Sequence, residues 1–399
     1  MSDPAREVAS VEDVDRSGAL SILLQGGLFR ANLVMTANHC AHWRALFPNA
    51  EIVLSVSVSD AVTGDVDIGG SMSGTRLVPR LAGNGVLAAA LASIVTVCDR
   101  LVLSPGATPL PPIKTDSGIN NCNLQIAAAR AGLAHVSGAY TLRVRSDFVF
   151  ADRSFLAYYA ETHRQPRGRA AVLKQRVLIS EFFTLNPYTL ERMPLHVSDW
   201  FHFGLTEDVR ALWDVPAMSF ADAVYYKTVP HAPGSNVPER RFLVRLAVEQ
   251  HIAKEALARH FPDLRLDYHN DLRSRDLTMR ILLDNFVICD TARCRVLLDK
   301  YKRNFTDGKM RVVCVTADDW RTLATAREVD FASFFARKIH LARRRLFLRH
   351  HPLVRPFRYA SKALASAACW LVGLSRSGRV IGMRDPSRPD LHLDSSKSR

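Results

Sequence analysis

The sequence predicts an α/β protein with a doubly wound, mixed sheet and helices on both faces. In the first half of the chain, segments rich in Val, Ile, Leu and Tyr alternate with segments whose apolar residues recur at helical spacing. Most of the strand-like segments are followed within a few residues by Gly, Pro or an acid, as expected where a strand leaves a sheet. This alternation is typical of a sheet covered on both sides. A basic, helical C-terminal extension follows it.

Each element is predicted from its own residues. The expected strands lie at residues 21–24, 51–58, 99–103, 140–147, 177–183, 196–204 and 285–289. The expected helices lie at residues 32–47, 121–133, 206–213 and 242–260. The second of these helices opens on Asn and Gln side chains and has Gly132 near its end. The third opens on Thr206 and two acids, a common helix start. Residues 87–95 fit either a helix or the approach to a strand.

Composition narrows the class of protein. The chain has 399 residues with 53 Lys or Arg against 39 Asp or Glu, so its formal net charge is +14. This excess suggests an anionic partner: nucleic acid, a membrane surface or a phosphorylated substrate. The polar N-terminal residues lack a signal-peptide pattern, and no apolar run approaches the roughly 20 residues that span a bilayer. We therefore expect a cytoplasmic protein whose seven cysteines are reduced and mostly buried.

The chain is expected to have four parts. They are a disordered tail at residues 1–17, the sheet-bearing domain at 18–310, a basic and mainly helical extension at 311–380, and a second disordered tail at 381–399. In the extension, apolar residues recur among arginines at 336–349, and an apolar stretch with Trp370 follows. This composition favours a helix lying on an anionic membrane surface. The alternative is a basic helical hairpin that packs on the domain and faces solvent.

The expected strand at residues 140–147 ends on a carboxylate, Asp147. In open α/β sheets, ligands bind just beyond the carboxyl ends of the strands. An acid in that position is suited to hold a divalent metal ion or a sugar hydroxyl. Two alternatives remain: Asp147 could cap a turn, or it could pair with Arg143 or Arg145, which share its face of a regular strand.

Short motifs are distributed over residues 18–305. The most specific are Arg-Ser-Asp at 145–147 and Ser-Asp-Trp-Phe at 198–201. The others are Leu-Gln-Gly at 24–26, Phe-Pro-Asn-Ala-Glu-Ile-Val-Leu-Ser at 47–55, Asn-Cys-Asn-Leu-Gln-Ile at 121–126, Arg-Ala-Gly-Leu at 130–133, Ile-Ser-Glu-Phe-Phe-Thr at 179–184 and Asn-Phe-Val-Ile at 285–288. In this order and spacing they resemble the WavE-type lipopolysaccharide synthesis family of glycosyltransferases.

The resemblance has limits. The chain has Gly27, Leu124 and Ser104 where the family has Pro, Arg and Asp. Residues after about 310 carry no resemblance. These departures concern the contacts to the donor more than the fold.

The resemblance implies a GT-A-like fold and a nucleotide-sugar-dependent glycosyltransferase that acts on lipopolysaccharide or another surface glycan. Asp147 would then be the counterpart of the family's Asp-x-Asp metal motif, reduced to one carboxylate. It would hold Mn²⁺ or Mg²⁺, which neutralises the departing diphosphate. Arg145 could instead neutralise the phosphates directly. The implied donor-binding residues are Gln25, Gly26, Asp60, Asn123, Gln125, Arg130, Arg145 and Asp147.

A carboxylate is also needed to take the proton of the acceptor hydroxyl. Asp199 is the first candidate, because Trp200 and Phe201 beside it are suited to stack on a sugar face. The alternative is a buried acid that orients a loop, with both aromatic residues in the core. Glu239, at the end of a Pro- and Gly-rich loop, is the competing candidate.

The expected partners are a nucleotide-sugar donor, a glycan or lipid-linked glycan acceptor, and the anionic inner face of the cell membrane. Two other classes of protein stay open. One is a non-catalytic protein that binds nucleotides or glycans, and the other is a basic nucleic-acid-binding protein. No nucleic acid is expected as a partner, because the chain has no recognisable nucleic-acid-binding motif.

Overall fold

A computed structural model describes Val14 and residues 18–28, 31–58, 85–104, 106–297, 309–326 and 328–350. The chain divides into two compact units, Met1–Arg343 and Arg344–Arg399. The fold described below is that of the first unit. Asp60, both predicted tails apart from Val14, and the predicted extension beyond residue 350 lie outside the described residues.

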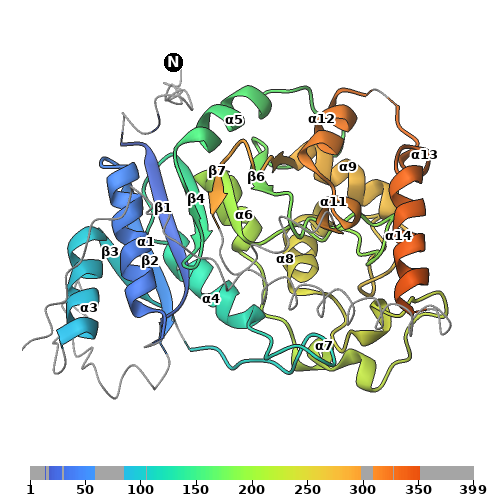
Figure 1. Cartoon of the computed structure of the whole chain (residues 1–399), viewed down its shortest axis with the longest axis horizontal. Coiled ribbons are helices and arrows are strands. Elements are labelled where there is room, and N and C mark those ends of the chain that lie inside the picture. The colour runs from blue at the N-terminus through green and yellow to red at the C-terminus, as the bar shows by residue number, and fades with distance from the viewer. Residues whose placement is uncertain are drawn as a thin grey trace, which may run out of the picture. The chain divides into compact units, whose positions relative to one another are not determined.

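The described part of the first unit contains a seven-stranded mixed sheet in the order β3-β2-β1-β4-β7-β6-β8 (Figure 1). Its strands are β1 (Leu20–Leu28), β2 (Glu51–Val58), β3 (Arg100–Leu103), β4 (Tyr140–Arg145), β6 (Val177–Ser180), β7 (Phe201–Leu205) and β8 (Phe286–Cys289). β7 runs antiparallel to both of its neighbours, whereas the other pairs of adjacent strands are parallel. A second, two-stranded sheet joins β5 (Val149–Phe150) to β9 (Val296–Leu297). The predicted α/β class and mixed sheet are confirmed.

One face of the sheet is covered by α1 (Leu33–Leu46) and α5 (Ser154–Thr162), and α3 (Gly85–Val97) packs against α1. Residues 87–95, for which the sequence allowed a helix or the approach to a strand, are therefore part of a helix. An aromatic cluster fills this interface: Phe150 and Phe155 stack with centroids 4.5 Å apart, and Trp43 and Phe47 contact them edge-on. Such pairs combine a large buried apolar area with favourable ring geometry.

The opposite face is covered by α4 (Cys122–Leu133) and α6 (Thr206–Trp213), and α8 (Val248–Leu257) packs on α6. α4 approaches the sheet closely because Gly132 has no side chain. A Cβ on that glycine would lie 2.3 Å from Leu23 Cδ1 and 2.8 Å from Ser55 Cβ. Ser55 Oγ also donates a hydrogen bond to Ala128 O at 2.7 Å within this contact. The glycine predicted to end a helix thus sets its distance from the sheet.

Three predicted elements are shorter than expected by three or more residues. The strand predicted at 177–183 ends at Ser180, and the strand predicted at 196–204 begins at Phe201. The intervening loop contains Phe183 and Leu195, which have φ values of 65° and 57° in the left-handed region. Such residues cannot continue a strand. The helix predicted at 242–260 begins only at Val248, because Phe242 is bridged to Lys114 instead.

The remaining helices surround the second half of the sheet. They are α7 (Phe220–Ala223), α9 (Arg275–Asn285), α11 (Lys309–Val313), α12 (Ala317–Thr325), α13 (Phe331–Phe334) and α14 (Ala336–His350), with short 3₁₀ turns η1 (Tyr225–Lys227), η2 (Glu239–Arg241) and η3 (Ala258–His260). Phe331 and Phe335 are buried and contact the ring of Tyr188. The compact unit that carries the sheet therefore includes α13 and the start of α14.

Two further findings bear on the sequence expectations. The six cysteines among the described residues are buried and form no disulfide. No helix in the described ranges combines the length and hydropathy needed to cross a bilayer.

Candidate functional site

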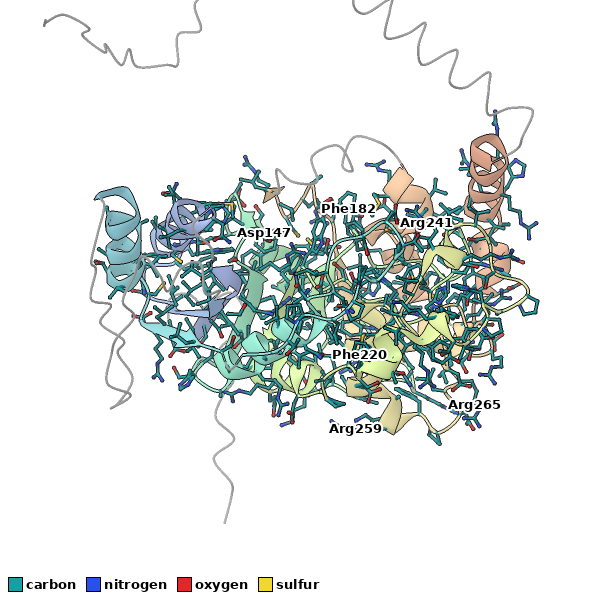
Figure 2. All side chains as sticks on the ribbon, turned by 90° about the horizontal axis from the view of Figure 1, so that it is seen from below. Asp147, Phe182, Phe220, Arg241, Arg259 and Arg265 are labelled. Carbon is teal, nitrogen blue, oxygen red and sulfur yellow. The ribbon has the colours of Figure 1, made fainter. Side chains whose placement is uncertain are left out.

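The sheet topology gathers several chain segments at one edge. The carboxyl ends of β1, β4, β6 and β8 meet there, and the antiparallel β7 starts there. The chain order reverses between β1 and β4, which is the position where open α/β sheets bind ligands. Figure 2 shows Asp147 and Phe182 on this same side of the unit, beyond the ends of β4 and β6. We call this region the carboxyl edge.

At the reversal, Gly26 on β1 lies against the residue that follows β4. Ser146 N donates a hydrogen bond to Gln25 O at 2.8 Å, which draws the two chains together. A Cβ on Gly26 would lie 2.2 Å from Ser146 Oγ and 3.1 Å from Ser146 Cβ. Gly26, a predicted donor-binding residue, is thus packed tightly against Ser146 whether or not it also contacts a ligand.

The substitution Gly26→Ala is therefore expected to destabilise the protein by about 1–3 kcal/mol, because the added methyl group forces the buried Ser146 side chain to move. The midpoint of urea unfolding measures this loss. Gly118→Ala is the matched control, since a Cβ at Gly118 meets no atom within 4 Å. Equal midpoints for the two variants would contradict the packing argument.

Arg143 is the centre of the polar contacts beneath the carboxyl edge. It is fully buried, and its Nε donates to Gln25 Oε1 at 2.5 Å while Nη1 donates to the backbone oxygen of Asp199. Its guanidinium also lies 4.0 Å from the centre of the Trp213 ring. Burial lowers the pKa of Arg143 to about 9, so that it is still a cation at neutral pH. Sequence reasoning treated Arg143 only as a partner for Asp147.

Arg145 and Asp147 form a bidentate ion pair at the end of β4. Arg145 Nε and Nη2 donate to the two carboxylate oxygens at 2.9 and 2.8 Å. The side chains are 24% and 25% exposed, so a ligand can reach them. Of the alternatives that the sequence left open, the pairing of Asp147 with Arg145 is therefore present. It does not exclude a role for either group with a phosphate, which is also a bidentate partner for arginine.

Whether a metal ion can bind at Asp147 depends on how many ligands the protein itself has to supply. Within the described ranges, no three His, Cys, Asp or Glu side chains converge to hold an ion. Mg²⁺, however, is commonly bound through one or two carboxylates while substrate phosphates and water supply the other oxygens. A single, partly exposed carboxylate at the carboxyl edge fits that mode. Arg145 would have to give up one of its two bonds to Asp147.

Asp199 lies in the loop just before β7, at the carboxyl edge, rather than inside a strand. It is 5% exposed, and its negative charge raises the pKa of Glu249 after the larger effect of burial. Trp200 and Phe201 are 2% and 0% exposed, and Trp200 packs against Phe182 and Phe183. The expectation that these two rings stack on a sugar is therefore wrong: they belong to the core, which was the stated alternative.

Glu239, the competing acid, has a different environment. It is fully buried in η2, where Arg192 donates to both of its oxygens at 2.8 and 2.7 Å. Asn236 N and Asn270 Nδ2 donate to Oε2 as well. Burial alone would raise its pKa, but these hydrogen bonds outweigh it and hold the pKa below the usual value. Its contacts tie the 227–240 loop to Arg192 and Asn270.

The other predicted donor-binding residues are distributed over α4. Gln125 joins the carboxyl edge through its backbone oxygen, which accepts a hydrogen bond from Gln25 Nε2 at 2.6 Å. Asn123 instead contacts the backbone of Met218 through both ends of its amide. Arg130 is 53% exposed and pairs with Asp214 at 3.4 Å. The structure thus brings Gln25, Gly26, Gln125, Arg145, Asp147 and Asp199 together, and it gives Asn123, Arg130 and Glu239 other partners.

A cavity of about 210 Å³ lies near this edge, and no pattern in the sequence predicted it. Residues from the loop before α4, the 183–196 loop, the start of α8 and α11 line it. His196 and Glu249 face each other there, with Nε2 and Oε2 3.4 Å apart. No local pattern could reveal this meeting, because the two residues belong to separate segments.

The sheet order and the polar carboxyl edge define a GT-A-like α/β protein. A comparison with family models gives the particular family: the chain matches the model of WavE lipopolysaccharide synthesis over residues 97–346. This is more than half of the chain, which therefore belongs to the WavE lipopolysaccharide synthesis family. The family match extends beyond residue 310, where the sequence motifs gave no resemblance, and residues 18–96 lie outside it. A comparison with curated proteins finds no match.

Proposed function

We propose that this protein is a nucleotide-sugar-dependent glycosyltransferase that acts on lipopolysaccharide or a related surface glycan. The observation that carries the proposal is the meeting of the Arg145–Asp147 pair and Asp199 at the carboxyl edge, beside the reversal of strand order. Membership in a lipopolysaccharide synthesis family supports the class of reaction.

In this proposal Arg145 and Asp147 bind the diphosphate of the donor. Arg145 would donate two hydrogen bonds to phosphate oxygens, as it now does to a carboxylate. Asp147 would hold Mn²⁺ or Mg²⁺, and the bound ion would neutralise charge on the diphosphate leaving group. Gln25, Gly26 and Gln125 would line the donor side of the edge.

Asp199 is proposed to take the proton of the acceptor hydroxyl. The backbone contact with Arg143 fixes the position of Asp199, and the low exposure of Asp199 keeps water from competing for the proton. A carboxylate needs to come within hydrogen-bond reach of the hydroxyl to act in this way. Asp60, a further proposed donor contact, lies outside the described residues.

A panel of nucleotide sugars, each assayed with and without Mn²⁺, tests the proposal. At least one of them is expected to raise the thermal unfolding temperature and to be hydrolysed slowly in the absence of acceptor. A rise in unfolding temperature without hydrolysis would support the non-catalytic nucleotide-binding alternative. No response to any donor would contradict the proposal.

We also propose that the protein binds the anionic inner face of the cell membrane through α14. Among the described side chains of this helix, Arg337, His340 and Arg343 are exposed at helical spacing, whereas Phe335 and Ala342 before and between them are buried. The helix thus presents a basic stripe to solvent. Each Lys or Arg near an anionic surface contributes about 1 kcal/mol to binding.

Sedimentation with phosphatidylglycerol vesicles at low salt tests this second proposal. Arg337→Glu/Arg343→Glu is expected to reduce the bound fraction strongly, because two attractions become two repulsions. Arg259→Glu/Arg265→Glu changes the net charge equally at other exposed positions of the unit and should have little effect (Figure 2). Equal losses in the two variants would mean that only net charge matters, and no sedimentation of the parent protein would refute the proposal.

A further inference from the structure

The cavity beside the carboxyl edge combines two kinds of lining. Most of its wall is apolar and comes from Ile113, Phe183, Leu185, Leu190, Met193, Phe242, Ala247, Met310 and Val313. The other lining residues are ionisable and form two pairs, Lys114–Glu191 and His196–Glu249. An apolar wall facing a few placed polar groups is typical of small-molecule sites.

The His196–Glu249 pair places two polar groups in the cavity wall. His196 Nδ1 lies 2.8 Å from Phe183 O, and since a carbonyl oxygen only accepts, Nδ1 carries a hydrogen. Nε2 faces Glu249 Oε2 at 3.4 Å, which is longer than an ordinary hydrogen bond. Both groups therefore keep hydrogen-bonding capacity for a hydroxyl group of a ligand.

The Lys114–Glu191 pair adds hydrogen-bond donors and acceptors to another wall of the cavity. Lys114 Nζ lies 2.8 Å from Glu191 Oε2, and both side chains are about one-quarter exposed, at 27% and 24%. The ammonium group is also 4.4 Å from the centre of the Phe242 ring. These contacts hold Lys114 in place without removing all of its hydrogen-bonding capacity, because an ammonium group has three donors.

From this lining we infer that the cavity binds a neutral sugar ring of the acceptor glycan. A sugar ring has an apolar C–H face and a rim of hydroxyls, which match the apolar wall and the two ionisable pairs. An acyl chain would offer no partner to the donors and acceptors that these two pairs leave available, and burying them unpaired is costly. An acidic sugar would be disfavoured, because Lys114 and His196 already pair with Glu191 and Glu249. The inference rests on the proposed function, because it assigns the acceptor side of the same site.

The position of the cavity agrees with this assignment. Phe183 in the cavity wall packs against Trp200, the residue that follows Asp199, with ring centroids 5.3 Å apart. Asp199 is in turn linked to Arg143 and Gln25 at the reversal of strand order. A ring seated in the cavity would therefore lie near the loop that carries the proposed general base.

Saturation-transfer NMR on the full-length protein tests the inference, with methyl glucoside and methyl galactoside as neutral probes. Methyl glucuronide and octanoate represent an acidic sugar and an acyl chain. Binding of a neutral glycoside is expected at millimolar concentration, and Glu249→Gln should weaken it about tenfold by removing a charged hydrogen-bond acceptor. Leu190→Trp, which fills the cavity, should abolish it.

Glu207→Gln is the matched control, because Glu207 is also an acid in the first turn of a helix but is half-exposed and pairs with Lys174. It should leave binding unchanged. Preferential binding of octanoate or glucuronide, no binding of any probe, or binding that survives both cavity substitutions would overturn the inference.

Donor hydrolysis by the parent protein separates this inference from the proposed function. Hydrolysis without glycoside binding would refute the cavity assignment alone. Glycoside binding without hydrolysis would leave a sugar-binding cavity in a protein that is not a transferase.

Discussion

Asp147→Asn is expected to lower donor hydrolysis and sugar transfer by roughly 100-fold or more, the loss typical of removing one charge-stabilising group from an active site. An amide cannot neutralise a divalent cation, and it accepts only one of the two hydrogen bonds from Arg145. In the proposed site, both effects weaken the binding of the departing diphosphate. Turnover of the best donor in the panel, measured at saturating Mn²⁺, gives the size of the loss.

The same substitution should leave the fold intact. The Arg145–Asp147 pair is about one-quarter exposed, and such partly solvated pairs contribute only about 0–1 kcal/mol to stability. Thermal unfolding of the variant is therefore expected within a few degrees of the parent protein. A folded variant with near-normal turnover would remove Asp147 from the site.

Asp271→Asn provides the matched control for Asp147→Asn. Arg273 donates to both carboxylate oxygens of Asp271, so the sequence separation and the bidentate geometry resemble those of the Arg145–Asp147 pair. Asp271 is fully buried and lies in the segment between α8 and α9, outside the carboxyl edge. Its substitution should reduce stability more and turnover less. A larger loss of turnover in Asp271→Asn than in Asp147→Asn would show that pairing with arginine, and not position at the carboxyl edge, determines the loss of turnover.

The fold was predictable because most of its strands have a recognisable local pattern of residues. β2 was predicted at its observed bounds, and β4 ends two residues before the predicted limit. The errors arise where tertiary contacts override a local pattern. Residues 242–247 have helical spacing, yet they form a bridge and a series of bends because Phe242 pairs with Lys114. A loop with left-handed residues at Phe183 and Leu195 takes the place of the facing ends of the two predicted strands on either side of it.

The candidate site was predictable only where it follows strand ends. Asp147 and Asp199 could be found because each lies next to a strand, and the topology then brings them to one edge. Arg143 could not be assigned, since its partners Gln25 and Asp199 come from segments more than 50 residues away on either side. The His196–Glu249 pair is hidden for the same reason.

Arg143→Met tests the most unusual group beneath the edge. Arg143 is a buried cation, and within the described residues its Nη2 has no hydrogen-bond partner. Removing it orphans Gln25 Oε1 and Asp199 O, which costs about 1–3 kcal/mol for each acceptor, but it also relieves the cost of burying a charge. The net loss in the free energy of unfolding is expected to be small, about 1–3 kcal/mol.

Turnover should fall much further, by about 100-fold, because Arg143 is the shared donor that fixes β1 and the loop before β7 relative to each other. A displacement of about 1 Å between reacting groups costs roughly that much in rate. Urea unfolding and turnover of the folded variant, measured at one temperature, separate the two losses.

Arg176→Met is the matched control for this prediction. Arg176 is 1% exposed, and burial lowers its pKa to about 10. It donates to the backbone oxygens of Leu283, Gln165 and Pro166, but it lies at the start of β6, at the opposite end of that strand from the carboxyl edge. Its removal should cost at least as much stability as the removal of Arg143 and leave the turnover of the folded protein unchanged. If both variants lose turnover only in proportion to the unfolded fraction, Arg143 has a structural role alone and does not position Gln25 and Asp199 for catalysis.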